Sequence, residues 1–281
     1  MKKKYALFGK GISYSLSPSI QGAIAAYYGR DLDYEIVDVD SVDEILTRLK
    51  SGVYAGANVT VPYKVALLPH MDALDPSAEA CGALNTVRVE EGRLIGYNTD
   101  SEGFLDVLTL HSYSLEEKRV LVYGTGGVAR GLVNALLDSP VKGILLDGRN
   151  QEAKIEVFRT FEQKSHDRLT VVYGLHGLLC DLAVNASTLG SASVPGLPID
   201  LEKMDAEAVY EVIYHPLETE LVRSAKERGL PVFTGLEMLI CQAIRAFYLW
   251  YPELACEQLD PDLFQAVRRK LEEELALEGG K

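Results

Sequence analysis

A glycine-rich turn carries the plainest chemical signal in this sequence. Within KRVLVYGTGGVARGLVNALL (residues 118–137), the glycines follow an apolar run and precede an amphipathic segment. In dinucleotide-binding folds, such a turn lets the backbone approach a pyrophosphate at the amino terminus of a helix, where the helix dipole favours anions. The pattern therefore predicts a strand, a turn and a helix that together bind a dinucleotide. The residues expected to contact it are Gly124, Gly126, Gly127 and Ala129.

The adenosine end of that dinucleotide has two candidate partners with opposite preferences. Asp147 ends the apolar run KGILLD (142–147), near the spacing of about 20 residues expected for an acid that binds the adenosine ribose. A carboxylate there favours NAD and repels the 2′-phosphate of NADP. Arg149 follows closely, and an arginine can pair with that phosphate. Both cofactors therefore stay open.

A lysine stands where neither a helix surface nor a plain linker explains it. The stretch NVTVPYK (58–64) places Lys64 after a β-branched run and just past Pro62. Because proline restricts the backbone, it stiffens the turn after the expected strand. We therefore expect the strand to deliver Lys64 to a site of chemistry.

Length and composition predict a globular protein of two domains. The chain has 281 residues, with 47% hydrophobic and 25% charged side chains, and domains average roughly 150 residues. The net charge of −13 speaks against nucleic acid or anionic lipid as partners. No signal-peptide core and no apolar run of the length of a membrane span is found, so we expect a cytoplasmic protein.

The histidines and cysteines show no spacing typical of metal ligands, so no metal site is expected. Free cysteines are commonly part of the core, which predicts buried thiols at all four positions. These positions are Cys81, Cys180, Cys241 and Cys256.

Strands and helices are expected to alternate in two series, which predicts an α/β fold with helices over largely parallel sheets. The helix at 17–29 is expected to begin with Ser17 as its cap, and the helix at 41–52 with a capping box of Ser41 and Glu44. Two helices end the chain and are expected to return to the first domain. Strands are expected at 4–9, 33–40, 56–61, 119–124, 142–147, 169–174, 181–187, 207–214 and 230–235, with a hairpin in 85–100, and the last helices at 236–251 and 261–278.

Four further segments, with the glycine turn, resemble the shikimate dehydrogenase family over nearly the whole chain. They are SYSLSPSIQ (13–21), NVTVPYK, ALNTV (83–87) with GYNTDSEGF (96–104), and GLEMLICQA (235–243). The resemblance implies a substrate-binding domain of residues 1–104 plus 237–281, and a Rossmann NAD(P)-binding domain of residues 105–236. It implies reversible reduction of 3-dehydroshikimate to shikimate, a step of aromatic amino acid biosynthesis through chorismate.

Oxidising a secondary alcohol requires loss of a hydride and of a proton, so one group must accept the proton. By resemblance, Lys64 is that catalytic group and Asp100 its acidic partner; which of them holds the proton at rest stays open. The resemblance also assigns Thr188, in NASTLG, and Gly235 to the cofactor side. By the same resemblance, the two serines of SYSLSPSIQ bind a carboxylate of the substrate, and Tyr214 lies between substrate and nicotinamide. The full set of implied substrate contacts is Ser15, Ser17, Thr60, Asn85, Asn98, Tyr214 and Gln242.

Structural alternatives exist for several of these residues. Ser17 can be a helix cap only, Asn98 can hold a turn through its own backbone, and Lys64 with Asp100 can be a structural ion pair. The chain departs from the family's pattern at Tyr14, where a histidine is usual, and at Ser101, where a glycine is common.

Two other functions stay open at this point. One is oxidation of quinate, alone or beside shikimate, which use of NAD would favour. The other is a non-catalytic sensor of shikimate-like compounds, which has no need of both a catalytic pair and a nucleotide turn. In each case the partner is a small molecule, and the chain is expected to be a monomer or a homodimer.

Overall fold

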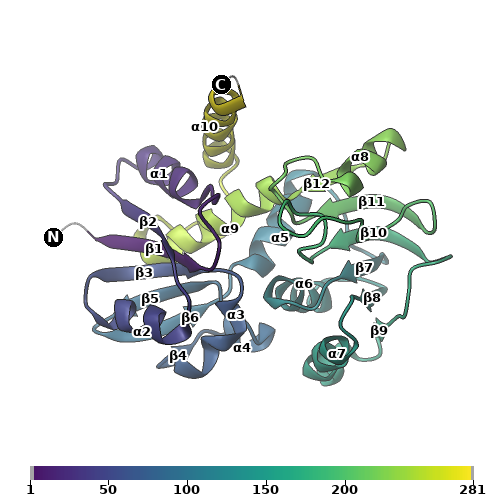
Figure 1. Cartoon of the computed structure of the whole chain (residues 1–281), viewed down its shortest axis with the longest axis horizontal. Helices are drawn as coiled ribbons and strands as arrows, with labels where there is room; N and C mark the ends of the chain where they lie inside the picture. The colour runs from purple at the N-terminus through teal and green to yellow at the C-terminus, as the bar shows by residue number, and fades with distance from the viewer. Residues whose placement is uncertain (1–2, 280–281) are drawn as a thin grey trace. The chain divides into compact units, whose positions relative to one another are not determined.

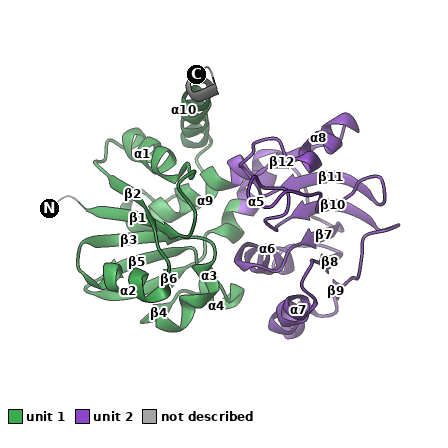
Figure 2. Ribbon diagram, viewed as in Figure 1, with its two compact units in different colours: residues 1–103, 239–281 green, residues 104–238 purple. Residues whose placement is uncertain are grey.

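The structure, a computed structural model, describes residues 3–279, with side chains up to Leu275. The chain divides into two compact units (Figure 2). Unit 1 comprises Met1–Gly103 and Leu239–Lys281, and unit 2 comprises Phe104–Met238. The sequence-based expectation put these boundaries after residue 104 and before residue 237. No helix among the described residues is long and apolar enough to cross a membrane.

Unit 1 is built on a mixed six-stranded sheet with the order β2-β1-β3-β5-β6-β4 (Figure 1). Strand β1 pairs in parallel with β2 and β3, and the hairpin β5–β6 joins β3 antiparallel. The strands are β1 (Lys4–Gly9), β2 (Asp33–Asp38), β3 (Tyr54–Val59), β4 (Ala73–Leu74), β5 (Thr86–Glu90) and β6 (Arg93–Tyr97). The helices of its first part are α1 (Ser17–Tyr27), α2 (Val42–Lys50), α3 (Tyr63–Ala66), the 3-10 helix η1 (Leu68–His70) and α4 (Pro76–Cys81), and α5 (Asp100–Leu110) begins in it.

The last two helices belong mainly to unit 1, as expected for helices that return to the first domain. They are α9 (Gly235–Trp250) and α10 (Pro261–Gly279), joined through the 3-10 helix η2 (Pro252–Leu254). Trp250 fixes α9 to the sheet: its indole N–H donates to the carbonyl of Val87 at 3.2 Å, and the centre of its ring lies 4.5 Å from that of Tyr5. This packing brings residues of α9 close to the ends of β5 and β6.

Unit 2 contains a six-stranded sheet in which all strands are parallel, with the order β12-β11-β10-β7-β8-β9. This order is that of the doubly wound Rossmann fold, in which ligands bind beyond the carboxyl ends of the strands. The strands are β7 (Arg119–Tyr123), β8 (Gly143–Asp147), β9 (Leu169–Val171), β10 (Leu179–Asn185), β11 (Asp205–Glu211) and β12 (Val232–Thr234). The helices are α6 (Gly127–Leu137), α7 (Gln151–Ser165) and α8 (Glu220–Glu227).

Local details confirm one expected cap and correct two other expectations. Ser41 accepts a hydrogen bond from the N–H of Glu44, as predicted. Ser17 does not cap α1: it is the first residue of the helix, and its N–H donates to the hydroxyl of Ser15 at 3.2 Å. Cys256 is exposed rather than buried, because it lies in the loop between η2 and α10; the other three cysteines are buried.

Candidate active site

Lys64 lies just beyond the carboxyl end of β3, as the sequence predicted, although a short helix rather than a turn presents it. After β3, the carbonyl of Thr60 accepts a hydrogen bond from the N–H of Tyr63, and the chain enters α3. The carbonyl of Lys64 accepts a hydrogen bond from the N–H of Leu84 at 2.8 Å, which ties α3 to the segment before β5. The backbone of Lys64 is therefore fixed by two neighbouring elements.

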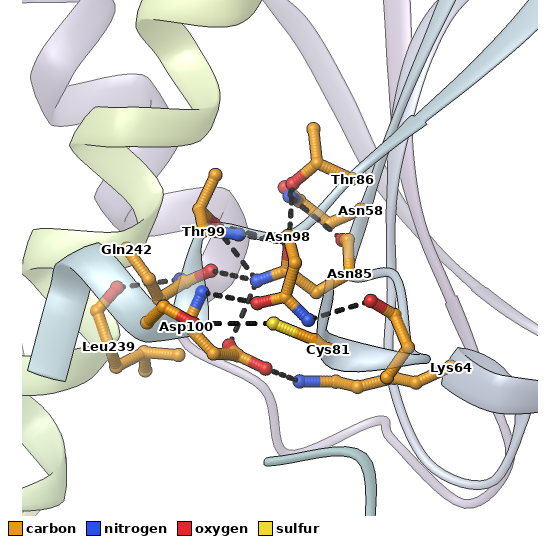
Figure 3. A network of polar contacts seen from close by, with 12 residues as sticks. Asn58, Lys64, Cys81, Asn85, Thr86, Asn98, Thr99, Asp100, Leu239 and Gln242 are labelled. Atoms are coloured by element: carbon orange, nitrogen blue, oxygen red, sulfur yellow. Dashed lines mark hydrogen bonds and ion pairs between the residues drawn. The ribbon is translucent and has the colours of Figure 1, made fainter. Parts of the chain in front are cut away.

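The ammonium of Lys64 pairs with the carboxylate of Asp100 at 2.6 Å (Figure 3). Their side chains are 11% and 5% exposed, so the pair is nearly dry but can be reached through Lys64. Asp100 begins α5, and its N–H donates to the amide oxygen of Asn98 at 2.9 Å. The amide nitrogen of Asn98 in turn donates to the carbonyl of Ala83. Both ends of the Asn98 amide therefore bond the backbone, as expected if Asn98 holds a turn instead of binding substrate.

Asn85 holds the other side of the same carboxylate. Its amide nitrogen lies 2.8 Å from Asp100 Oδ1 and 2.9 Å from the hydroxyl oxygen of Thr99, while its amide oxygen accepts from the N–H of Thr99. Thr99 was not among the predicted site residues, although it stands in the middle of the NTD motif. Together these contacts orient Asp100 Oδ2 toward Lys64 (Figure 3).

Gln242 reaches this network from α9. Its amide oxygen lies 3.3 Å from the amide nitrogen of Asn85, and its amide nitrogen donates to the carbonyl of Leu239. Gly103 permits this approach, because a Cβ there would lie 2.8 Å from the backbone nitrogen and from Cβ of Gln242. The structure therefore brings together four residues predicted from widely separated motifs: Lys64, Asn85, Asp100 and Gln242.

Of the two serines predicted to bind a carboxylate, Ser15 lies in the loop after β1 and Ser17 is the first residue of α1. The hydroxyl of Ser15 donates to that of Ser17 at 3.0 Å. Thr60 follows the neighbouring parallel strand and packs close to Gly9 at the end of β1. Among the described residues, no hydrogen bond joins either serine to the Lys64–Asp100 pair. Tyr14 is half exposed beside them.

The glycine turn of unit 2 has the geometry that a dinucleotide requires. Gly124 has a φ of +144°, and a Cβ there would lie 2.6 Å from the carbonyl of Ala186. Gly126 precedes α6 and provides no side-chain cap, so the first N–H groups of the helix are open to an anion. Ala129 is fully buried, as a close helix–strand contact demands. The residues present therefore fit a bound pyrophosphate.

Asp147 and Arg149 differ in burial and in their exposure to a ligand. Asp147 ends β8 and is buried in an ion pair with Lys154, at 2.7 Å, a partner that the sequence analysis did not identify. Arg149, two residues further on, is exposed. Burial raises the pKa of the nearby Tyr123; Asp147 adds to this rise and Arg149 opposes it.

The remaining predicted cofactor residues are Thr188, which follows β10, and Gly235, which follows β12. The predicted substrate contact Tyr214 follows β11. Thr188 is exposed in the loop after β10, Tyr214 is half-buried in the loop after β11, and Gly235 packs against the backbone of Val212. Both loops are joined by a buried carboxylate, Glu211, which the sequence analysis also missed. A charged residue within the apolar run AVYEVIY is the signal that could have identified it.

Glu211 is a hub of hydrogen bonds at the end of β11. It accepts from the amide of Asn185 at 2.9 Å, from the hydroxyl of Thr219 at 2.9 Å and from the N–H of Ile213 at 3.0 Å. Asn185 also donates to the carbonyl of Leu189, so the contacts span both loops. Burial raises the pKa of Glu211 to about 7, although these hydrogen bonds oppose the rise.

A doubly wound nucleotide-binding unit, combined with a lysine–aspartate pair in a polar network, is typical of an NAD(P)-dependent oxidoreductase. A family model described as the shikimate dehydrogenase substrate binding domain matches residues 7–87. A curated shikimate dehydrogenase (NADP(+)) from Nitrosopumilus maritimus is 33% identical over 257 residues, which is 89% of this chain and 94% of that protein. The chain belongs to the shikimate dehydrogenase family.

Two further comparisons agree. A shikimate dehydrogenase (NADP(+)) from Moorella thermoacetica is 36% identical over 257 residues, covering 87% of this chain and 86% of that protein. The solved structure of shikimate 5-dehydrogenase from Thermus thermophilus, in complex with NADP(H) and shikimate, matches with a TM-score of 0.82 and 31% identity. The match covers 95% of this chain and 99% of that one. The family and the α/β fold class predicted from the sequence are confirmed.

Proposed function

We propose that this protein reversibly reduces 3-dehydroshikimate to shikimate with NADP as the preferred cofactor. The observation that carries the proposal is the Lys64–Asp100 pair, held at 2.6 Å within a network that includes Asn85 and Gln242. The curated relatives described above are named shikimate dehydrogenases dependent on NADP(+), which supports the same substrate and cofactor. Unit 1 is the proposed substrate-binding domain and unit 2 the proposed cofactor-binding domain.

The chemistry assigned to Lys64 is proton transfer. When the carbonyl of the substrate is reduced, its oxygen gains a proton, which Lys64 donates; in the reverse direction Lys64 accepts the proton of the hydroxyl. Asp100 lies close enough to exchange that proton with Lys64 and to hold its side chain in one position. A bound dinucleotide supplies or accepts the hydride. Asn85 keeps Asp100 in place, so it supports the reaction through the acid.

Most of the other predicted contacts keep the roles given by the resemblance, and Asn98 is the exception. Ser15 and Ser17 are proposed to bind the substrate carboxylate, since both hydroxyls lie near the amino terminus of α1, where an anion is favoured. Thr60 is proposed to bind a ring hydroxyl, Gln242 to bind the substrate, and Tyr214 to lie between substrate and nicotinamide. Asn98 uses both ends of its amide for the backbone, so we propose that it acts by holding Asp100.

The proposed setting is the cytoplasm, with small molecules as the partners and a monomer or homodimer as the functional form. The net charge of −13 supports the absence of nucleic acid and anionic lipid from that list.

The test is the initial rate of NADPH formation from shikimate and NADP, followed by absorbance. Lys64→Ala is expected to lower kcat by about 10²–10⁴-fold with a much smaller change in KM, because the proton acceptor is lost while most substrate contacts remain. Lys226→Ala is the matched control, since it removes an exposed ion pair with Glu218. Near-normal kcat in Lys64→Ala would remove its assigned role, and a wild-type protein with no turnover would contradict the proposed function.

A further inference from the structure

The carboxylate of Asp147 is held on several sides by the chain itself. Its Oδ1 accepts from Lys154 Nζ at 2.7 Å and from the N–H of Gly148 at 2.8 Å, and its Oδ2 accepts from the N–H of Gly174 at 3.1 Å. A carboxylate offers about four acceptor positions, so most of them are already used. Because Asp147 is also buried, it is a poor partner for the hydroxyls of a ribose.

Lys154 lies near the amino terminus of α7, and its side chain is 0% exposed. Its ammonium also donates to the carbonyl of Val172 at 3.0 Å and lies 4.4 Å from the ring centre of Tyr173. A buried cation near the positive end of a helix is costly unless an anion pairs with it. The fold therefore keeps Lys154 and Asp147 together, and their charges cancel at the carboxyl end of β8.

A pocket of about 410 Å³ adjoins this pair, within the size range of small-molecule sites. Asp147 and Tyr173 line it, and so do Asp200 and Lys203. The second acid of the pocket is paired as well, since Lys203 lies 2.7 Å from Asp200. Neither carboxylate of the pocket therefore acts as an isolated negative charge.

We propose that Lys154 determines cofactor specificity: by cancelling the charge of Asp147, it lets this end of the sheet accept the 2′-phosphate of NADP. This inference rests on the proposed function and deepens it, since it explains how an acid at the position typical of NAD-dependent enzymes is compatible with NADP. Arg149 is exposed two residues beyond Asp147 and can meet the phosphate. Lys154 acts through Asp147 and is not itself expected to touch the cofactor.

The test measures binding of adenosine 2′,5′-bisphosphate and of 5′-AMP by isothermal titration calorimetry. These two probes separate recognition of the 2′-phosphate from recognition of adenosine. Lys154→Gln leaves Asp147 with an uncompensated charge, so we expect it to lower the affinity for the bisphosphate, relative to 5′-AMP, by about tenfold. Asp147→Asn leaves the cation uncompensated, and the same ratio of affinities should rise or stay level.

The double variant Asp147→Asn/Lys154→Gln is the matched control, because it is again neutral at this position. It should return the affinity for the bisphosphate, relative to 5′-AMP, to within about threefold of the wild-type value. In turnover assays, the ratio of kcat/KM for NADP over NAD should follow the same order across the four proteins. If Lys154→Gln weakens both probes equally or neither, or if the double variant keeps the lowered ratio, Lys154 is only structural. Wild-type turnover of shikimate beside such a result would leave the proposed function intact.

Discussion

We expect Glu211 to make the stability of unit 2 depend on pH, and Glu211→Gln to remove the part of that dependence that comes from Glu211. The glutamine is close in shape and can keep the essential contacts. Its amide oxygen can accept from Asn185 and from the N–H of Ile213, as Glu211 Oε1 does, and its amide nitrogen can donate to the hydroxyl of Thr219. The substitution therefore changes the charge of the site more than its packing.

The size and direction of the effect follow from the pKa of Glu211. Its ordinary value is 4.5, and burial raises the pKa to about 7 in the folded protein. Between these two values the folded protein keeps a proton that the unfolded chain releases. The free energy of unfolding therefore falls as the pH rises from about 4.5 to 7, by about 3 kcal/mol in all, and levels off above that range.

The assay is urea unfolding of the wild type and of Glu211→Gln at intervals from about pH 4.5 to about pH 8, followed by circular dichroism. Other titrating groups are common to both proteins, so the difference between their free energies of unfolding isolates Glu211. That difference should shift by about 3 kcal/mol in favour of the variant as the pH rises. A difference that stays constant with pH would refute the reasoning, because it would mean that Glu211 is ionised equally in the folded and unfolded states.

Two further predictions test the geometry, one in each unit. Asn85→Ala removes the donor to Asp100 Oδ1 from a buried network, so it should lower the free energy of unfolding by about 2 kcal/mol and also reduce kcat. If both values were unchanged, Asn85 would not hold Asp100 in place. Gly124→Ala places a Cβ against the carbonyl of Ala186 at a positive φ and should cost about 2 kcal/mol or more in urea unfolding. Gly126→Ala is the comparison, because Gly126 has a φ of −80° and open space around it, so this variant should lose less than about 1 kcal/mol of the free energy of unfolding. If both variants lost the same amount, the contact between residue 124 and the backbone of Ala186 would not be the cause.

The sequence predicted most of the strands and several helices because their signals are local, whereas the short elements α3, β4 and α4 were not expected. The glycine turn, its strand and its helix lie within 118–137, and the spacing alone indicates their arrangement. The site of unit 1 is different, because Asn85 and Gln242 are 157 positions apart and meet through the packing of α9. Periodicity cannot place such residues together. Only the resemblance to a family linked these motifs before the structure was known.

The sequence misled where burial contradicts the usual behaviour of a residue type. A lysine near the start of a helix is normally solvated, so nothing indicated that Lys154 is fully buried beside Tyr173. Asp147 was accordingly predicted as a ribose partner, with Arg149 as the alternative for a 2′-phosphate, and its internal contacts were not expected. Ser17 was expected as a cap, but the loop lets Ser15 satisfy the N–H of Ser17 instead.

Two buried lysine–aspartate pairs among the described residues illustrate why an ion pair alone does not identify a catalytic site. Lys64–Asp100 and Lys154–Asp147 have nearly the same length, 2.6 and 2.7 Å. They differ in access, since the side chain of Lys64 is 11% exposed and that of Lys154 is 0% exposed. A group that exchanges a proton with a substrate must be reached by it, whereas a group that only cancels a charge need not be. The difference in access therefore supports the proton transfer proposed for Lys64, and it fits the proposal that Lys154 influences the ligand only through Asp147.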